Sequence, residues 1–263
     1  MLFGIGALLT ACPSAKPAAT LTSSESWCPD HFEVGPSDTC FAVPETTTKA
    51  TPILIYLHGP YAGHGSAEEW EIVHSAVAKG FAVVVPRGKR GLCAWTAEVK
   101  DHFCWPQEVE DPQAFKAAVA DWDRVLWQVD AILESGSHNK RYILGYSQGG
   151  LFASYLASHA LFPAQAYAIV NGGPLGPMKK PPSAAPLILL SAENDAAQAP
   201  KMTALHDDLN KASWPHAYCT HPGGHALSAS DFDAALAFFK RDADGSLKAK
   251  DNAYTCDGKD PAK

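Results

Sequence analysis

Short apolar runs alternate with longer amphipathic segments over most of the chain. The runs are nearly continuous in apolar and β-branched residues, which predicts buried strands over residues 52–59, 81–88, 141–147, 166–173 and 186–195 and from His216 onward. In the intervening segments apolar residues recur at helical spacing, which predicts helices over residues 66–80, 111–136, 149–162, 199–213 and 230–243. Strands that are apolar on both faces and alternate with helices predict an α/β fold, a mostly parallel, doubly wound sheet with helices on both faces.

Functional residues of such a sheet lie in the loops at the carboxyl ends of its strands. Four clusters directly follow predicted strands: residues 59–64, Ser147, residues 193–195 and residues 221–225. The stretch Gly145-Tyr146-Ser147-Gln148-Gly149 fits G-x-S-x-G between a strand and a helix, the context in which this motif holds a nucleophile. Its glycines allow a sharp turn that lifts the serine hydroxyl clear of the sheet.

With this motif the chain resembles an α/β-hydrolase, and "GYSQGG" is similar to the elbow of the carboxylesterase, phospholipase and acyl-thioesterase branch. Leu57-His58-Gly59 after the first core strand matches the oxyanion-loop signature of this family. The resemblance spans roughly Pro52 to Lys240, and the cysteine-bearing loop is loosely similar to those of feruloyl esterases and polyhydroxybutyrate depolymerases. It implies an α/β-hydrolase fold and a serine hydrolase activity that needs no cofactor.

A serine hydroxyl becomes nucleophilic when a histidine takes its proton and an acid orients that histidine. The family order is serine, acid, histidine, so Asp195 is the favoured acid, with Glu193 as the alternative. His225 follows two glycines and precedes a helix, which favours it as the base over His221.

The oxyanion hole of this family uses two backbone N–H groups, and Gln148, the residue after the nucleophile, supplies one of them. Pro60 occupies the usual position of the second donor and has no N–H group, so Tyr61 is the predicted substitute. His58 precedes Ser147 in the chain, against the family order, and is expected to be a structural hydrogen-bonding residue.

The segment 87–106 leaves the second core strand with two cysteines and two tryptophans and is expected to lie over the carboxyl edge of the sheet. Trp95 and Trp105 are candidates to stack on a substrate, and His64 is a further candidate contact. The alternative is that both indoles pack against a disulfide.

The cysteines favour an exported protein. Beside Cys12 the sequence has an even set that contains no C-x-x-C pair: Cys28, Cys40, Cys93, Cys104, Cys219 and Cys256. Disulfides are therefore more plausible than a metal site. Proximity favours pairing of Cys28 with Cys40 and of Cys93 with Cys104, leaving Cys219 for Cys256, although the sequence does not fix the pairing.

The N-terminus suggests how the chain is exported. Residues 1–12 end in Leu9-Thr10-Ala11-Cys12, which resembles a bacterial lipobox in which Cys12 carries lipid, although no Lys or Arg precedes the apolar run. Residues 13–27 are rich in Pro, Ala, Ser and Thr, as a flexible tether would be, and residues 28–263 are expected to form one hydrolase domain. A lipid anchor would be the only contact with a membrane, in the cell envelope, and the protein would otherwise be secreted.

Charge and histidine spacing exclude other classes. The formal net charge of the 263 residues is -7, without a basic stripe, which argues against nucleic acid as a partner. Pro222 and the glycines between His221 and His225 rule out the helical geometry of H-E-x-x-H metal sites, so no metal is expected.

The sequence thus predicts a secreted or membrane-tethered serine hydrolase acting on a small or polymeric carboxylic ester through a Ser-His-Asp triad. One alternative is a peptidase or amide hydrolase on the same fold. The other is a catalytically inactive binding lipoprotein, which Pro60 encourages and the complete Ser, Asp and His set opposes.

Overall fold

The sheet is the frame that positions every candidate residue. In the computed structural model, which describes residues 26–93, 95–136, 139–250 and 253–256, its strands lie in the order β1-β2-β4-β3-β7-β8-β9-β10. Their bounds are β1 Glu33–Gly35, β2 Thr39–Ala42, β3 Ile53–Leu57, β4 Ala82–Pro86, β7 Arg141–Tyr146, β8 Ala166–Val170, β9 Leu187–Ala192 and β10 His216–His221. Neighbouring strands from β4 to β10 pair in parallel, and only β1 and β2 add an antiparallel edge. The predicted mostly parallel sheet is confirmed.

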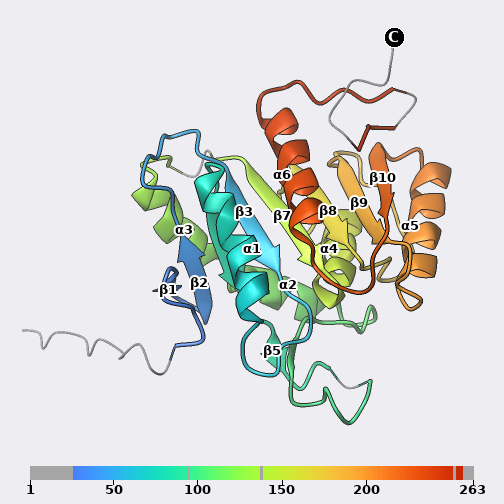
Figure 1. Cartoon of the computed structure of the whole chain (residues 1–263), viewed down its shortest axis with the longest axis horizontal. Coiled ribbons are helices and arrows are strands. Elements are labelled where there is room, and N and C mark those ends of the chain that lie inside the picture. The colour runs from blue at the N-terminus through green and yellow to red at the C-terminus, as the bar shows by residue number, and fades with distance from the viewer. Residues whose placement is uncertain (1–25, 94, 137–138, 251–252, 257–263) are drawn as a thin grey trace, which may run out of the picture.

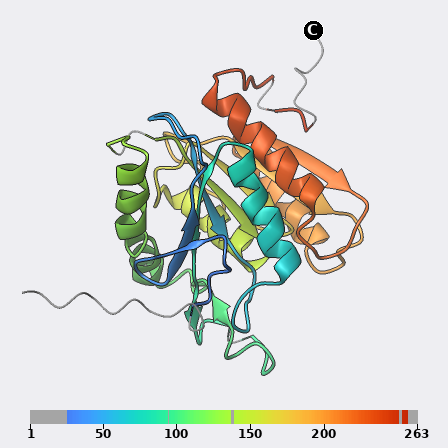
Figure 2. The same cartoon turned by 60° about the vertical axis from the view of Figure 1, so that its left-hand side comes forward.

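Helices cover both faces of this sheet (Figure 1). They are α1 Ala67–Ala78, α2 Pro112–Ala120, α3 Asp123–Ile132, α4 Gln148–His159, α5 Ala199–Lys211 and α6 Ala229–Ala243. Alternate residues of each strand separate two hydrophobic layers: Leu54 and Tyr56 pack with α1 and α6, while Ile53 and Ile55 pack with α2 to α5. Figure 2 shows α3 on the opposite side of the sheet from α1 and α6.

Local sequence explains where several helices start. Ser66 Oγ accepts a hydrogen bond from the Glu69 N–H group at 3.1 Å, and Ser228 Oγ accepts one from the Asp231 N–H group at the same distance. Asp111 Oδ1 caps α2 in the same way, and Pro112 occupies the first helical position, where its missing N–H group is tolerated. These caps satisfy N–H groups that the start of a helix leaves unpaired.

The single helix expected over residues 111–136 is wrong, because the structure has two helices there, α2 and α3. Asp121 and Trp122 lie between them and keep right-handed helical backbone angles, so the apolar spacing continues across the break. The buried Trp122 ring at the junction packs against Phe152 and Phe162, with centroid distances of 6.1 and 5.6 Å. Because neither residue at this break is Gly or Pro, and the apolar spacing continues through it, the sequence does not reveal that the helix is interrupted.

The sequence also gave no prediction for two short antiparallel pairs. One is β1 with β2 at the sheet edge, and the other is β5 (Lys89–Arg90) with β6 (Phe103–Cys104). The β5–β6 pair lies at the end of the sheet to which β3 points (Figure 1), as expected for the segment 87–106. A backbone bridge between Tyr61 and Phe103 attaches β6 to the loop after β3.

Three disulfides stabilise the loops. They join Cys28 to Cys40, Cys93 to Cys104 and Cys219 to Cys256, the pairs that sequence proximity favours, with Cα–Cα distances of 5.5 to 5.6 Å. Such bonds persist in oxidising compartments, so the pairing is typical of a protein outside the cytoplasm. The described helices include none long and apolar enough to cross a bilayer. The predicted lipobox with Cys12 lies outside the described residues.

An aromatic cluster beneath α4 provides a stability test. Phe152 is fully buried and stacks on Trp105 and Phe115, with centroid distances of 5.1 and 5.7 Å. We expect Phe152→Ala to lower the free energy of unfolding by about 3–5 kcal/mol, because the substitution leaves a cavity. Denaturant unfolding measures the change.

The matched control for this test is Trp127→Ala on α3, where the side chain is 74% exposed. Removing this exposed ring should change the free energy of unfolding by less than about 0.5 kcal/mol. An equal effect of both substitutions would contradict the assignment of Phe152 to the core.

Candidate active site

Ser147 sits at a strained turn between β7 and α4. Its backbone angles are φ 54° and ψ −117°, a combination that non-glycine residues rarely adopt. A Cβ atom added to Gly149 would lie 2.0 Å from the Leu57 carbonyl oxygen, and one added to Gly145 would lie 2.2 Å from the Gly149 carbonyl oxygen. The glycines are therefore required because α4 starts in direct backbone contact with the ends of β3 and β7.

A hydrogen-bonded chain joins Ser147, His225 and Asp195. Ser147 Oγ lies 2.8 Å from His225 Nε2, and His225 Nδ1 lies 2.5 Å from Asp195 Oδ2. An ionised carboxylate only accepts hydrogen bonds, so Nδ1 carries the proton of a neutral ring and Nε2 faces the serine with its lone pair. These three residues come from the loops after β7, β9 and β10, as the sequence predicts.

Asp195 is held as a carboxylate. Burial alone would raise the pKa of Asp195, but the hydrogen bond from His225 and the N–H groups of Gln198 and Ala197 outweigh it and hold this pKa below its ordinary value. The two N–H groups donate to Oδ1 at 3.1 and 3.2 Å, which leaves Oδ2 for His225. The same contacts fix the orientation of the carboxylate, which is 3% exposed as a side chain.

Asn171, which the sequence analysis did not single out, connects the loops that carry Asp195 and His225. Its side-chain oxygen accepts from the Ala192 N–H group at 2.7 Å, and its side-chain nitrogen donates to the Ala226 carbonyl at 3.0 Å. Asn171 has φ 44°, a left-handed conformation that asparagine tolerates better than most residues. The buried amide therefore holds the end of β9 against the residue next to His225.

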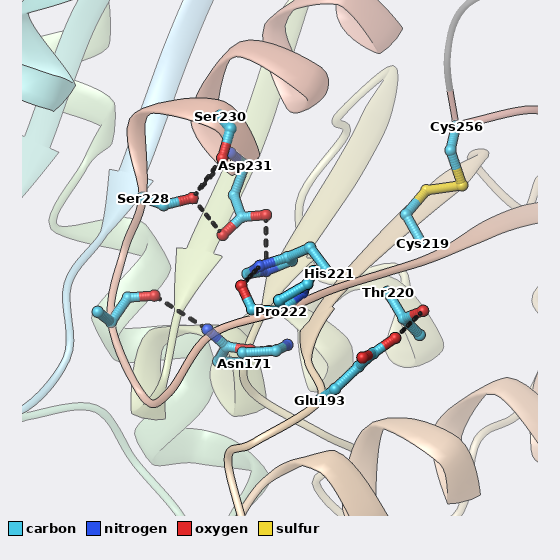
Figure 3. Close-up of polar contacts among 12 residues, drawn as sticks. Asn171, Glu193, Cys219, Thr220, His221, Pro222, Ser228, Ser230, Asp231 and Cys256 are labelled. Carbon is cyan, nitrogen blue, oxygen red and sulfur yellow. Dashed lines mark hydrogen bonds and ion pairs between the residues drawn. A yellow bond between two sulfur atoms is a disulfide. The ribbon is translucent and has the colours of Figure 1, made fainter.

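The loop that carries His225 runs from the end of β10 to the start of α6. Polar contacts among His221, Ser228 and Asp231 join its two ends (Figure 3). His221 Nε2 lies 2.9 Å from Asp231 Oδ1, and Ser228 Oγ donates to Asp231 Oδ2 at 2.7 Å. His221, the alternative base, thus lies against Asp231, whereas the imidazole that contacts Ser147 is that of His225. His216 is also unavailable, since it is buried and its Nε2 lies 2.7 Å from His206 Nδ1.

The carboxylate that contacts His225 is that of Asp195, whereas Glu193, the alternative acid, contacts Thr220. Glu193 is exposed, and its Oε1 accepts a hydrogen bond from Thr220 Oγ1 at 3.0 Å (Figure 3). The geometry therefore favours Asp195 over Glu193 as the acid.

Gln148, the first predicted oxyanion donor, is held in place by hydrogen bonds from its side chain to the Trp105 backbone. Gln148 is the first residue of α4, where a helix leaves its N–H groups without intrahelical acceptors. Its side chain forms two hydrogen bonds with the Trp105 backbone, accepting from N–H at 2.8 Å and donating to the carbonyl at 2.7 Å. The segment closed by Cys93–Cys104 thus clamps the start of α4.

The prediction of Tyr61 as the second oxyanion donor is wrong. Its backbone N–H group donates to the Phe103 carbonyl at 3.2 Å, within the bridge that attaches β6, so this group is already used. Since Pro60 has no N–H group, the loop can offer those of its neighbours Gly59 and Ala62, which line the same pocket.

His58 is a structural residue beneath this loop. Its Nε2 accepts from the Gly88 N–H group at 3.0 Å, and its Nδ1 contacts the Gly59 carbonyl. Burial, against the opposing effect of this carbonyl, lowers the pKa of His58 to about 3, so the ring is neutral. A neutral ring with Nδ1–H and an acceptor at Nε2 fits both contacts.

The pocket beside Ser147 has a volume of about 270 Å³. It is lined by Pro60, His64, Glu69, Tyr146 and His225, among others. His64 thus remains a candidate substrate contact. The pocket lining does not include Trp95, although its indole is 47% exposed.

Trp105 does not contact this pocket, contrary to the sequence prediction. Its side chain is 2% exposed, stacks on Phe152, and donates from Nε1 to the His58 carbonyl at 2.9 Å. This indole is therefore part of the core, where it packs on other aromatic rings.

Known structures have the same fold. No family model and no curated protein matches the sequence. Among solved structures, esterase PE8 is 17% identical with a TM-score of 0.56, over 79% of this chain and 97% of that chain. The Bacillus cereus carboxylesterase is 17% identical with a TM-score of 0.56 over 78% and 93% of the two chains, and Zea mays acyl-protein thioesterase 2 is 15% identical with a TM-score of 0.58 over 78% and 98%. The chain therefore has the α/β-hydrolase fold.

Removing the Asn171 amide tests how this site is held together. Asn171→Ala leaves the buried Ala192 N–H and Ala226 carbonyl groups without partners, so we expect the free energy of unfolding to fall by about 2 kcal/mol. Denaturant unfolding measures this change.

The conservative variant Asn171→Asp keeps the acceptor for Ala192 but loses the donor to Ala226. A carboxylate oxygen would then face the Ala226 carbonyl oxygen, so the variant should displace the residue next to His225 and slow labelling of Ser147 by a fluorophosphonate. Normal stability and labelling in both variants would show that Asn171 does not hold the two loops.

Proposed function

We propose that this protein is a serine hydrolase that cleaves carboxylic esters, with Ser147 as nucleophile, His225 as base and Asp195 as the orienting acid. The observation that carries the proposal is the unbroken chain from Ser147 Oγ to His225 and Asp195 at a strained turn beside an open pocket. The esterases and the thioesterase that share the fold support an ester as the substrate class.

The proposed reaction begins when Ser147 Oγ attacks the ester carbonyl and its proton passes to His225 Nε2. The Asp195 carboxylate stabilises the imidazolium, and the Gln148 N–H group binds the developing oxyanion at the start of α4. Collapse of the tetrahedral intermediate breaks the bond between the carbonyl carbon and the alcohol oxygen. The leaving alcohol takes the proton from His225. Water then attacks the acyl-enzyme with His225 as base, and the carboxylic acid leaves.

The pocket supports an ester of modest size. A volume of about 270 Å³ lies just below the range of about 300–1,000 Å³ that is typical of sites for drug-sized ligands. We further propose that the protein works outside the cytoplasm, secreted or held to the cell envelope by lipid on Cys12. The disulfides support export, and the Leu9-Thr10-Ala11-Cys12 sequence supports the anchor.

Kinetics on p-nitrophenyl esters test the roles of the three residues. We expect Ser147→Ala and His225→Ala each to lower kcat by about 10⁴-fold or more, with the double variant little worse because both residues act in one step. Asp195→Asn should lower kcat by about 10⁴-fold by favouring the wrong imidazole tautomer, whereas Glu193→Gln should be near wild type.

Matched ester and anilide substrates separate the two enzymatic classes. Much faster turnover of the ester supports the proposal, and faster turnover of the anilide would favour an amide hydrolase. If folded wild-type protein neither turns over esters nor labels at Ser147 with a fluorophosphonate, the inactive binding protein becomes the better account.

The Gln148 clamp predicts a separate effect on turnover. Gln148→Ala removes both hydrogen bonds to the Trp105 backbone while keeping the N–H group, so only the position of that group changes. We expect kcat to fall by about 10- to 100-fold with little change in KM, since the oxyanion forms only during the reaction. Gln113→Ala, an exposed residue on α2, is the control. An unchanged kcat in Gln148→Ala would show that the hydrogen bonds between Gln148 and Trp105 do not affect catalysis.

A further inference from the structure

Glu69 occupies a helix start but does not behave as a cap. With Ser66 before α1, the spacing matches a capping box, in which the glutamate side chain normally turns back to the cap residue. Only the half made by Ser66 Oγ is formed. The Glu69 carboxyl instead accepts hydrogen bonds at Oε1 from the hydroxyls of Tyr56 and Tyr61. It lines the pocket that also contains Ser147.

These contacts favour the ionised carboxylate. Burial and the charge of Glu69 raise the pKa of Tyr56 and of Tyr61 well above the ordinary value, so both hydroxyls remain protonated donors. Burial is the larger effect on Glu69 and raises its pKa above the ordinary value, although the hydrogen bonds from the two tyrosines oppose that rise. Because both tyrosines use Oε1, the second oxygen is left as an acceptor for a ligand.

The negative charge has no cationic partner in the pocket. Among the described residues that line it, none is Lys or Arg, and only His64 and His225 can become positive. The two tyrosine hydroxyls are neutral donors, so they do not neutralise the charge of the half-buried Glu69 carboxylate, and a cation in the substrate would be stabilised beside it. An anionic substrate would be repelled.

Tyr146 connects this charge to the candidate nucleophile. Its ring stacks on His225 at a centroid distance of 5.5 Å and lines the same pocket. Burial, then the charges of Glu69 and Asp195, raises the pKa of Tyr146 to about 12, so this ring lies within the field of both carboxylates. Glu69 and Ser147 thus face one substrate volume.

We propose that Glu69 determines specificity, and that the pocket prefers esters whose acyl chain carries a protonated primary amine. This inference rests on the proposed ester hydrolysis at Ser147. The ammonium group would donate to the Glu69 carboxylate while the ester carbonyl lies against Ser147.

The test uses isosteric substrate pairs, in which an ammonium group replaces a methyl group. The pairs are the p-nitrophenyl esters of β-alanine and butyric acid, and of 6-aminohexanoic acid and heptanoic acid, so two chain lengths are sampled. Glu69→Gln keeps an oxygen to accept from both tyrosines but removes the charge. Glu68→Gln, an exposed neighbour on α1, is the control for loss of charge alone.

We expect the ratio of kcat/KM for the ammonium ester over the neutral ester to fall roughly tenfold in Glu69→Gln, for at least one chain length, with the neutral ester unaffected. Glu68→Gln should leave the ratio unchanged. An unchanged ratio in Glu69→Gln, or an equal loss for both esters, would overturn the inference and make Glu69 a structural anchor of Tyr61. Failure of the wild type to cleave any ester would instead overturn the proposed function.

Discussion

The structure depends on one close backbone contact, between the first turn of α4 and the ends of β3 and β7. Gly149 lies against the Leu57 carbonyl and Gly145 against the Gly149 carbonyl, with no space for a side chain at either position. This contact forces the chain to reverse at Ser147, which takes the strain as a positive φ. It also places the start of a helix, with its free N–H groups, next to the serine hydroxyl.

Residues distant in sequence then hold the other groups around that turn. Asn171 joins the loops after β9 and β10, so Asp195 and His225 are positioned by one buried amide as well as by each other. The Cys93–Cys104 segment contacts the residue after Ser147 through the Trp105 backbone and the Gln148 side chain. Contacts from distant segments therefore hold both the proposed base and the start of α4 next to the proposed nucleophile.

The sequence predicts the layered fold and the Ser147, Asp195 and His225 set, because strand ends and the elbow have strong local signals. It cannot predict contacts that depend on tertiary pairing. Tyr61 loses its free N–H group because it pairs with Phe103 of β6, and Trp105 is buried because its ring stacks on Phe152 and donates to the His58 carbonyl. The sequence does not single out Glu69 as a pocket residue. Its spacing from Ser66 matches a capping box, which already explains a glutamate at this position.

The central claim is that Ser147 forms an acyl-enzyme, and rapid quenching of a p-nitrophenyl ester reaction tests it most directly. Intact mass and peptide mapping would follow the adduct while p-nitrophenol release is recorded. The account predicts a burst of one p-nitrophenol per chain and an acyl group on the peptide that contains Ser147. An acyl group on another residue, or turnover with neither burst nor adduct even when deacylation is slowed by a bulky acyl chain, would contradict it.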